Sequence, residues 1–150
     1  MDPIKSILEK LETDGMDLEG ETSFPVLGDN VLVTIALSGS NEPHSSQVDT
    51  LNWFHNSIQS LYPEIEKTIY DYYMASLPNY HIGLGELSSE LMPSLKDKSE
   101  VWKYVTEPGI YIFPENEGGD LHLEYECTFD VDHGLRVKFV DRKLSGVGID

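Results

Sequence analysis

The chain has 150 residues, of which 39% are hydrophobic and 10% aromatic, and its formal net charge is −17. This length and apolar content are typical of one domain with one core, so we expect residues 1–150 to form a single domain. Direct nucleic-acid binding is excluded, because phosphate contacts need clustered cations and this charge repels a polyanion. The sequence has no run of about 18 apolar residues, and charged residues interrupt its N-terminus, which argues against a membrane span and a signal peptide and predicts a cytoplasmic protein.

Acidic residues gather in two segments that lack lysine and arginine. Ten acids lie between Lys10 and Lys67, and eight lie between Tyr104 and Leu135. Mutual repulsion of this size opposes compaction, so two interpretations stay open: the charge serves solubility alone, or it attracts a basic protein partner. The single cysteine excludes an intramolecular disulfide, which fits a reducing compartment.

The N-terminal third predicts one short helix and one hairpin. Apolar residues recur at helical spacing from Ile4 to Leu11, and Gly15 ends this helix. An acidic connector is expected to about Thr22. Two apolar runs, 24–27 and 31–35, flank the turn residues 28–30 and predict two strands. A loop rich in Ser, Gly, Asn and Pro follows at 38–46.

One long helix is predicted over residues 47–77, because apolar residues recur there every three to four positions. Pro63 removes a backbone hydrogen bond inside it, so either the helix kinks there or two helices meet there. Residues 78–93 are expected to be irregular, and Ser99 is expected to cap a short helix through about Val105. Trp53 and Tyr70 are candidates for exposed aromatic anchors.

The C-terminal part predicts antiparallel strands. Residues 110–113 form a short strand and 115–120 an acidic turn. Apolar and polar residues alternate from 121 to 129, which predicts a strand with one buried face, and a final strand covers 144–149. A turn centred on Asp132 would place Phe129 opposite Leu135 and Glu126 opposite Lys138.

Together these elements predict an α+β fold. It consists of an antiparallel β-sheet with one long helix, kinked or divided at Pro63, packed on one face, and short additional helices.

The densest group of chemically active residues is Asp130-Val131-Asp132-His133-Gly134. Two carboxylates and an imidazole are ligands that a divalent metal uses, but an Asp-rich turn ending in glycine is also what a hairpin requires. We favour turn chemistry or partner contact and predict no metal or cofactor. Cys127 occupies an inward position and is predicted to be a core residue, not a nucleophile.

Two carboxylates, Glu124 and Glu126, lie on the polar face of the same predicted strand. Such a pair occurs in glycosidases. The following strand carries Arg136 and Lys138, so we favour cross-strand ion pairing in solvent.

A resemblance is carried by the segment Cys127-Thr128-Phe129-Asp130-Val131-Asp132-His133-Gly134-Leu135 and by the later Val147-Gly148. The segment resembles the C-terminal hairpin of a family of small acidic bacterial domains of unknown function. In that family an aromatic residue, Asp, any residue, an acid, His and Gly precede the penultimate strand. Here Phe129 stands where Trp is usual, Asp132 where Glu is usual, and Arg136 where a second Gly is common. The chain is also similar in size and acidity to immunity proteins of contact-dependent and other polymorphic toxin systems.

We therefore expect a non-enzymatic, protein-binding immunity or antitoxin-like protein. It would cover the active or substrate-binding site of a cognate toxin, a basic nuclease, with an acidic surface. The residues expected to contact this partner are Glu115, Glu117, Asp120, Glu124, Glu126, Asp130, Asp132 and His133. Two alternatives stay open: a metal-dependent hydrolytic enzyme that uses Asp130, Asp132 and His133, and a general intracellular interaction domain.

Overall fold

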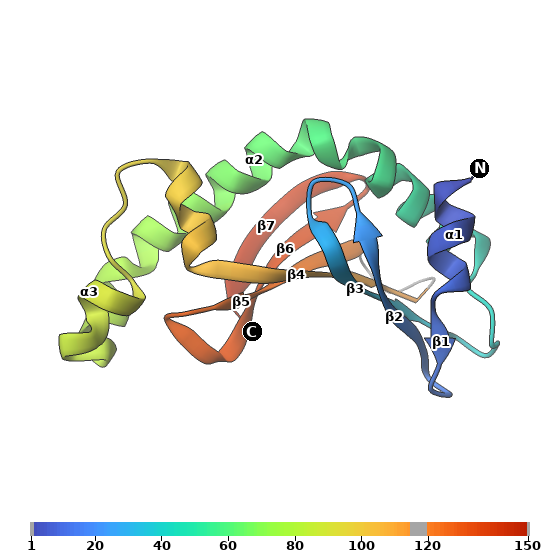
Figure 1. Cartoon of the computed structure of the whole chain (residues 1–150), viewed down its shortest axis with the longest axis horizontal. Helices are drawn as coiled ribbons and strands as arrows, with labels where there is room; N and C mark the ends of the chain where they lie inside the picture. The colour runs from blue at the N-terminus through green and yellow to red at the C-terminus, as the bar shows by residue number, and fades with distance from the viewer. Residues whose placement is uncertain (1, 115–119, 150) are drawn as a thin grey trace.

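The computed structural model describes residues 2–114 and 120–149, which form a seven-stranded sheet in the order β1-β2-β3-β4-β5-β6-β7 (Figure 1). The strands are β1 (Glu12–Thr13), β2 (Asp17–Phe24), β3 (Gly28–Ala36), β4 (Val105–Ile112), β5 (Leu121–Cys127), β6 (Asp130–Val140) and β7 (Lys143–Ile149). The helices are α1 (Pro3–Glu9), α2 (Ser45–Leu84), α3 (Ser88–Leu91) and two 3₁₀ segments, η1 (Gly85–Leu87) and η2 (Lys98–Lys103). This arrangement confirms the predicted α+β class.

One strand pair departs from the antiparallel prediction. Strand β3 pairs with β4 in parallel, with Val33 opposite Ile110 and Ile35 opposite Ile112, while the other neighbouring pairs are antiparallel. A parallel pair needs a long crossover, and α2 supplies it. The crossover therefore joins the N-terminal hairpin and the C-terminal strands into one sheet.

Helix α2 crosses one face of the sheet and supplies the helical half of the core (Figure 1). Its inward stripe, from Leu51 through Phe54 and Ile58 to Tyr73, is fully buried. The helix is continuous through Pro63 and Pro78, so of the two alternatives predicted at Pro63, the meeting of two separate helices is absent. Both prolines are exposed, and on the outer side of a curved helix a carbonyl that loses its partner can bond to water.

The helix is also longer than predicted. It extends past Leu77 to Leu84 and is followed by η1 and α3, so the prediction of irregular structure from Pro78 to Pro93 was wrong. The short helix η2 is capped by Asp97, whose Oδ1 accepts a hydrogen bond from the Ser99 amide, and not by Ser99 itself. Trp53 and Tyr70 are half-buried against the core and not exposed anchors.

The predicted acidic connector before Thr22 is in fact strand. Residues 17–24 form β2. The hairpin turn lies at 25–27, whereas the sequence predicted it at 28–30. The inward residues Gly20 and Thr22 are too small or too polar to produce an apolar alternation. Gly20 is required, because a Cβ there would lie 2.6 Å from the carbonyl oxygen of Lys10 at the end of α1.

The predicted register of the β5–β6 hairpin was wrong, although the predicted strand and its buried face were correct. Residues 128–129 form the turn, with Cys127 opposite Asp130 and Tyr125 opposite Leu135. Four residues of β6, 131–134, thus bulge opposite Glu126 alone. The cross-strand ion pair is therefore Glu124–Arg136 and not Glu126–Lys138, at 3.4 Å between Oε2 and Nε.

Among residues 2–114 and 120–149, no helix is both long enough and apolar enough to cross a membrane.

Gln47 fastens the start of α2 to the ends of two strands. Its side chain is 4% exposed, and Nε2 donates hydrogen bonds to the carbonyls of Ala36 (2.6 Å) and Phe113 (2.8 Å). Its Oε1 accepts a hydrogen bond from the His44 amide at 2.9 Å, which completes the N-terminal cap of the helix. One amide thus satisfies three backbone groups at the point where the crossover begins.

We predict that Gln47→Ala lowers the free energy of unfolding by about 2–4 kcal/mol, because it leaves buried backbone groups without partners. Chemical denaturation measures this loss. Gln59→Ala, at an exposed position of the same helix, is the matched control and should change stability by less than about 0.5 kcal/mol. Equal effects of the two substitutions would contradict the assigned role of Gln47.

Candidate functional site

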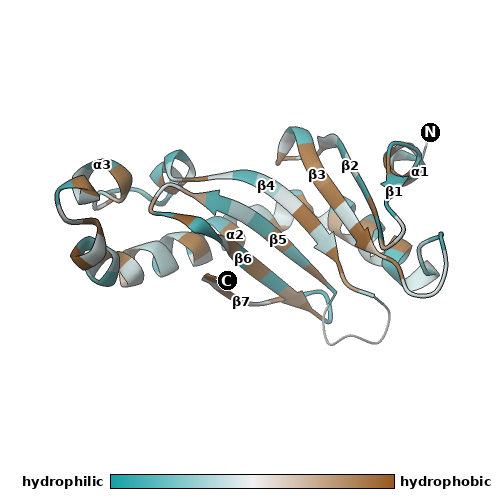
Figure 2. Cartoon of the chain, turned by 90° about the horizontal axis from the view of Figure 1, so that it is seen from below, coloured by the Kyte–Doolittle hydropathy of each residue, from teal (hydrophilic) through white to brown (hydrophobic). Residues whose placement is uncertain are grey.

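No helix covers the face of the sheet opposite α2, as Figure 2 shows from below. A row of aligned positions crosses it from β2 to β6: Glu21, Leu32, Gly109, Glu124 and Arg136. Because Gly109 has no side chain, the row is hollow at its centre. This hollow belongs to the candidate site.

A groove of about 350 Å³ occupies this hollow, and we call it the acidic groove. Four glutamates line it: Glu21 from β2, Glu107 from β4, and Glu124 and Glu126 from β5. None of its lining residues is a lysine or arginine. Arg136 lies beside it, with its Nε 3.4 Å from Glu124, an ion pair that is more than one third exposed and therefore offsets little of the local charge.

The two cation-poor segments of the sequence meet in this groove. Glu21 comes from the first segment, and the other three glutamates come from the second. They become neighbours because β3 and β4 pair in parallel at the centre of the sheet. Parallel pairing therefore concentrates negative potential on one face, where a hollow focuses it further.

Strand β4 contains a bulge at the rim of the groove. Its register with β5 shifts between Thr106 and Gly109, and Glu107 has a φ of +57°. A non-glycine residue in this region costs about 1–3 kcal/mol and is held there only when its surroundings require it. Bulges re-aim side chains beside functional sites, and this one turns Glu107 toward the groove.

Of the predicted contact residues that the structure describes, only two line the acidic groove. Glu124 and Glu126 line the groove, while Asp120 lies at the opposite end of β5 from the hairpin turn and accepts a hydrogen bond from the Arg142 amide at 2.6 Å. Asp130, Asp132 and His133 lie at the β5–β6 hairpin. Glu115 and Glu117 lie outside the described residues.

Two groove residues, Glu21 and Glu107, are absent from the predicted set. Alternation of Glu19 and Glu21 with Leu18, Gly20 and Thr22 is a weak strand signal that would have placed Glu21 on the polar face. No local signal identifies Glu107, because its position depends on the bulge in β4.

Asp130 holds the β5–β6 hairpin against α2. The Tyr80 hydroxyl donates to its Oδ2 at 2.6 Å, and His133 Nδ1 lies 2.9 Å from its Oδ1. Burial raises the pKa of Asp130, but the hydrogen bonds from Tyr80 and His133 outweigh it, and the pKa lies below its ordinary value. Both carboxylate oxygens are thus engaged within the fold.

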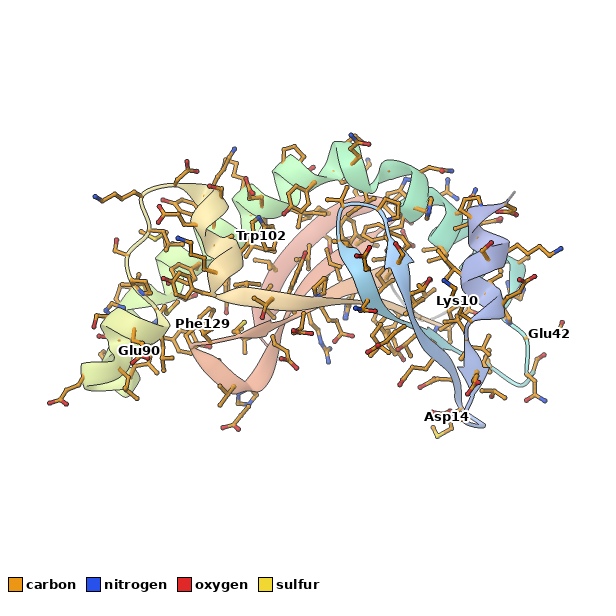
Figure 3. The ribbon with its side chains drawn as sticks, in the orientation of Figure 1. Lys10, Asp14, Glu42, Glu90, Trp102 and Phe129 are labelled. Carbon is orange, nitrogen blue, oxygen red and sulfur yellow. The ribbon has the colours of Figure 1, made fainter. Side chains whose placement is uncertain are left out.

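Phe129 completes this attachment. Its ring is 3% exposed and packs edge-on against Tyr73 and Tyr80, at centroid distances of 5.4 and 5.1 Å. Figure 3 shows Phe129 at the end of the molecule where the hairpin meets the C-terminal part of α2. The aromatic residue and the aspartate that follows it act together as an anchor between sheet and helix.

The described residues contain no group of three or more His, Cys, Asp or Glu side chains arranged to hold a metal ion. Asp132 is exposed, whereas Asp130 is engaged with Tyr80 and His133. Cys127 is buried, as its inward position predicts, and burial raises its thiol pKa to about 12, so the thiol stays protonated near neutral pH.

Residues 7–149 match the family described as "Domain of unknown function (DUF6985)". The chain belongs to this family. No curated protein and no solved structure matches it. Membership agrees with the expected resemblance to domains of unknown function, and the match extends well beyond the C-terminal hairpin on which that resemblance was based.

In this DUF6985 domain, two sides of the molecule receive residues of the segment Phe129-Asp130-Val131-Asp132-His133-Gly134: the side of α2 and the solvent. Phe129 and Asp130 face α2 and attach the hairpin, while Asp132 and His133 face solvent. Gly134 lines the acidic groove. The segment therefore links the packing of α2 to the shape of the groove.

We predict that Asp130→Asn lowers the free energy of unfolding at pH 7 by about 1–3 kcal/mol, because charged hydrogen bonds to Tyr80 and His133 are weakened. The lowered pKa means that this contribution is complete above the ordinary aspartate pKa of about 3.9 and is lost as pH falls through the lower folded value. Denaturation of both proteins from pH 7 to pH 2 should therefore show the difference shrinking below about pH 4.

The matched control is Asp132→Asn, which removes the same charge from an exposed neighbouring residue. It should leave stability unchanged to within about 0.5 kcal/mol. A difference between wild type and Asp130→Asn that stayed constant down to pH 2 would contradict the role of the Asp130 carboxylate.

Proposed function

We propose that this domain is a non-enzymatic binding protein of the immunity type, and that its acidic groove receives the cationic surface of a partner protein. The carrying observation is the convergence of Glu21, Glu107, Glu124 and Glu126 on one hollow with no cationic lining residue. Four carboxylates around one depression repel one another. An incoming lysine or arginine relieves that repulsion and gains charge-assisted hydrogen bonds.

The charge also acts at a distance. A net charge of −17 attracts a basic protein and accelerates its association, most strongly at low ionic strength. Nucleases carry basic surfaces to hold nucleic acid, so an acidic groove that occupies such a surface excludes the substrate phosphates. The resemblance of the chain to immunity proteins in size and acidity supports a toxin nuclease as this partner.

The hydrolytic alternative has weaker support. It requires Asp130, Asp132 and His133 to converge on a metal or a substrate. Asp130 instead accepts a hydrogen bond from Tyr80 and pairs with His133 as part of the attachment to α2. A binding role requires no such convergence, because the acidic groove is already formed in the structure.

We predict that an octalysine peptide binds the protein and that changing the four groove glutamates to glutamine weakens this binding by at least about tenfold. Fluorescence anisotropy of the labelled peptide measures the affinity. Binding should weaken as salt rises from about 50 to 200 mM, because screening reduces the attraction between exposed charges.

The matched control is a fourfold variant in which Glu42, Glu64, Glu86 and Glu90 become glutamine. These residues are exposed and lie outside the groove. The variant removes four negative charges, as the groove variant does, so both variants have the same net charge. It should bind octalysine within about threefold of wild type. Equal losses in both variants would show that net charge, and not the groove, holds the peptide, and would overturn the proposal.

The immunity role has a direct test in the open reading frame immediately upstream of the gene. We predict that its product arrests growth of a bacterial host and that co-expression of this chain restores growth. Gly109→Val should abolish the rescue, because the added side chain fills the centre of the groove. A Cβ at Gly109 meets only ordinary contacts, the nearest at 3.4 Å from the Leu32 carbonyl oxygen, so the fold should persist.

Gly146→Val on β7 is the control, since a Cβ there has open space around it and Gly146 does not line the groove. This variant should rescue growth as wild type does. A harmless upstream product, or full rescue by Gly109→Val at equal expression, would contradict the immunity assignment or the use of the groove.

A further inference from the structure

A second pocket, of about 260 Å³, adjoins the acidic groove and has a different chemistry. We call it the aromatic pocket. Its walls include Val26 and Leu27 from the β2–β3 turn, Tyr62 from α2, Trp102 from η2 and Pro108 from β4, with Tyr125 from β5 among its lining residues. Glu107, Pro108 and Tyr125 line both cavities, so the pocket and the groove meet at the bulge in β4.

Tyr125, one of the residues that line this pocket, carries an unsatisfied polar group. The residue is 4% exposed, and its hydroxyl oxygen is buried without a hydrogen-bond partner among residues 2–114 and 120–149. A buried hydroxyl normally has a partner, because leaving it unpaired is unfavourable. Burial and the neighbouring Tyr62 raise the pKa of the phenol, so it remains neutral and keeps its lone pairs available as acceptors.

The walls of the pocket are held in place by aromatic packing. Tyr62 and Trp102 are stacked, with centroids 5.3 Å apart and an interplanar angle of 19°, and Trp102 lies 5.4 Å from the ring of Tyr125. The indole Nε1 of Trp102 donates to Glu66 Oε2 at 2.7 Å, which fixes the orientation of the indole. Figure 3 shows Trp102 on η2, close to α2. The walls of the pocket are therefore held in place in the free protein.

Two strained residues border the same pocket. Val26 has a φ of +70°, a conformation that is unfavourable for a β-branched side chain, and Glu107 has a φ of +57°. The other two non-glycine residues with positive φ among residues 2–114 and 120–149, Asp141 and Arg142, form the tight β6–β7 turn, where such angles are usual. Backbone strain at Val26 and Glu107 thus coincides with the aromatic pocket.

We propose that the aromatic pocket binds the side chain of an arginine from the cationic partner. Three features select a guanidinium group. Its plane stacks on the aromatic walls, its N–H groups donate to the free lone pair of Tyr125, and its charge pairs with Glu107 at the junction with the groove. A lysine ammonium lacks the plane, and a neutral side chain lacks the charge.

This inference rests on the proposed function only for the source of the arginine. The pocket itself is tested with a small compound, Nα-acetyl-arginine amide. Titration is followed by NMR at the indole N–H of Trp102, with the indole of Trp53 as an internal reference. We expect saturable shifts at Trp102, and at least about tenfold weaker binding of the corresponding lysine and citrulline amides, which lack the plane and the charge respectively.

The decisive variant is Tyr125→Phe, which removes the hydroxyl and keeps the ring. It should weaken binding of the arginine compound by at least about fivefold, because the acceptor is lost. It should also keep or raise the melting temperature, because the free protein loses an unpaired buried group. Tyr70→Phe is the control: the Tyr70 hydroxyl bonds to the Leu95 carbonyl at 3.5 Å outside the pocket, so its loss should leave arginine binding unchanged.

The inference is overturned if the arginine compound gives no saturable shift, if Tyr125→Phe binds it as wild type does, or if the lysine compound binds equally well. A clear drop in melting temperature for Tyr125→Phe would also count against it, since the hydroxyl would then have a partner. Octalysine binding to the groove separates the two proposals. If it persists while the arginine compound fails, only the pocket assignment falls, and the reverse result removes only the proposed use of the groove.

Discussion

The rest of the structure depends on one constraint: a single long helix covers one face of a seven-stranded sheet. The apolar side chains of the strands turn toward α2 and α1, and the buried stripe of α2 meets them. Two attachments position that helix. Gln47 ties its beginning to the ends of β3 and β4, and Phe129 with Asp130 ties the hairpin to its second half. Because one face takes all the helical packing, the other face is left for polar residues.

The open face concentrates charge that the sequence holds in two separate segments. Placing Glu21 near Glu107, Glu124 and Glu126 raises the electrostatic energy of the folded state, and a sheet has no structural need for this arrangement. The bulge at Glu107 adds backbone strain at the same place. Local destabilisation of this kind is typical of a surface that a partner completes, which is why we interpret the groove as a binding site.

The segment Phe129–Gly134 and the proposed site have different physical roles. Phe129 and Asp130 are buried or half-buried and hold elements together, so changing them alters stability. The groove and the aromatic pocket instead use residues from seven elements, namely β2 to β6, α2 and η2, and no single distinctive motif supplies them. A motif that is easy to recognise therefore marks the scaffold here, and the binding surface depends on how distant segments are assembled.

Periodicity in the sequence was sufficient to predict the long helix, the buried face of residues 121–129 and the α+β class, because each is a local pattern imposed by one apolar environment. It was insufficient for β2, where the inward positions are Gly20 and Thr22, and for the continuation of α2 past Leu77 and Pro78 to Leu84. The hairpin register was mispredicted because the core takes Phe129 for contacts with Tyr73 and Tyr80, and the turn therefore lies at residues 128–129 and not around Asp132. Only the tertiary structure decided that β3 pairs in parallel with β4, since that pairing arises from long-range packing across the α2 crossover. The same pairing determined which acids share a groove, and the packing around it left the hydroxyl of Tyr125 without a partner in the part of the chain that the structure describes.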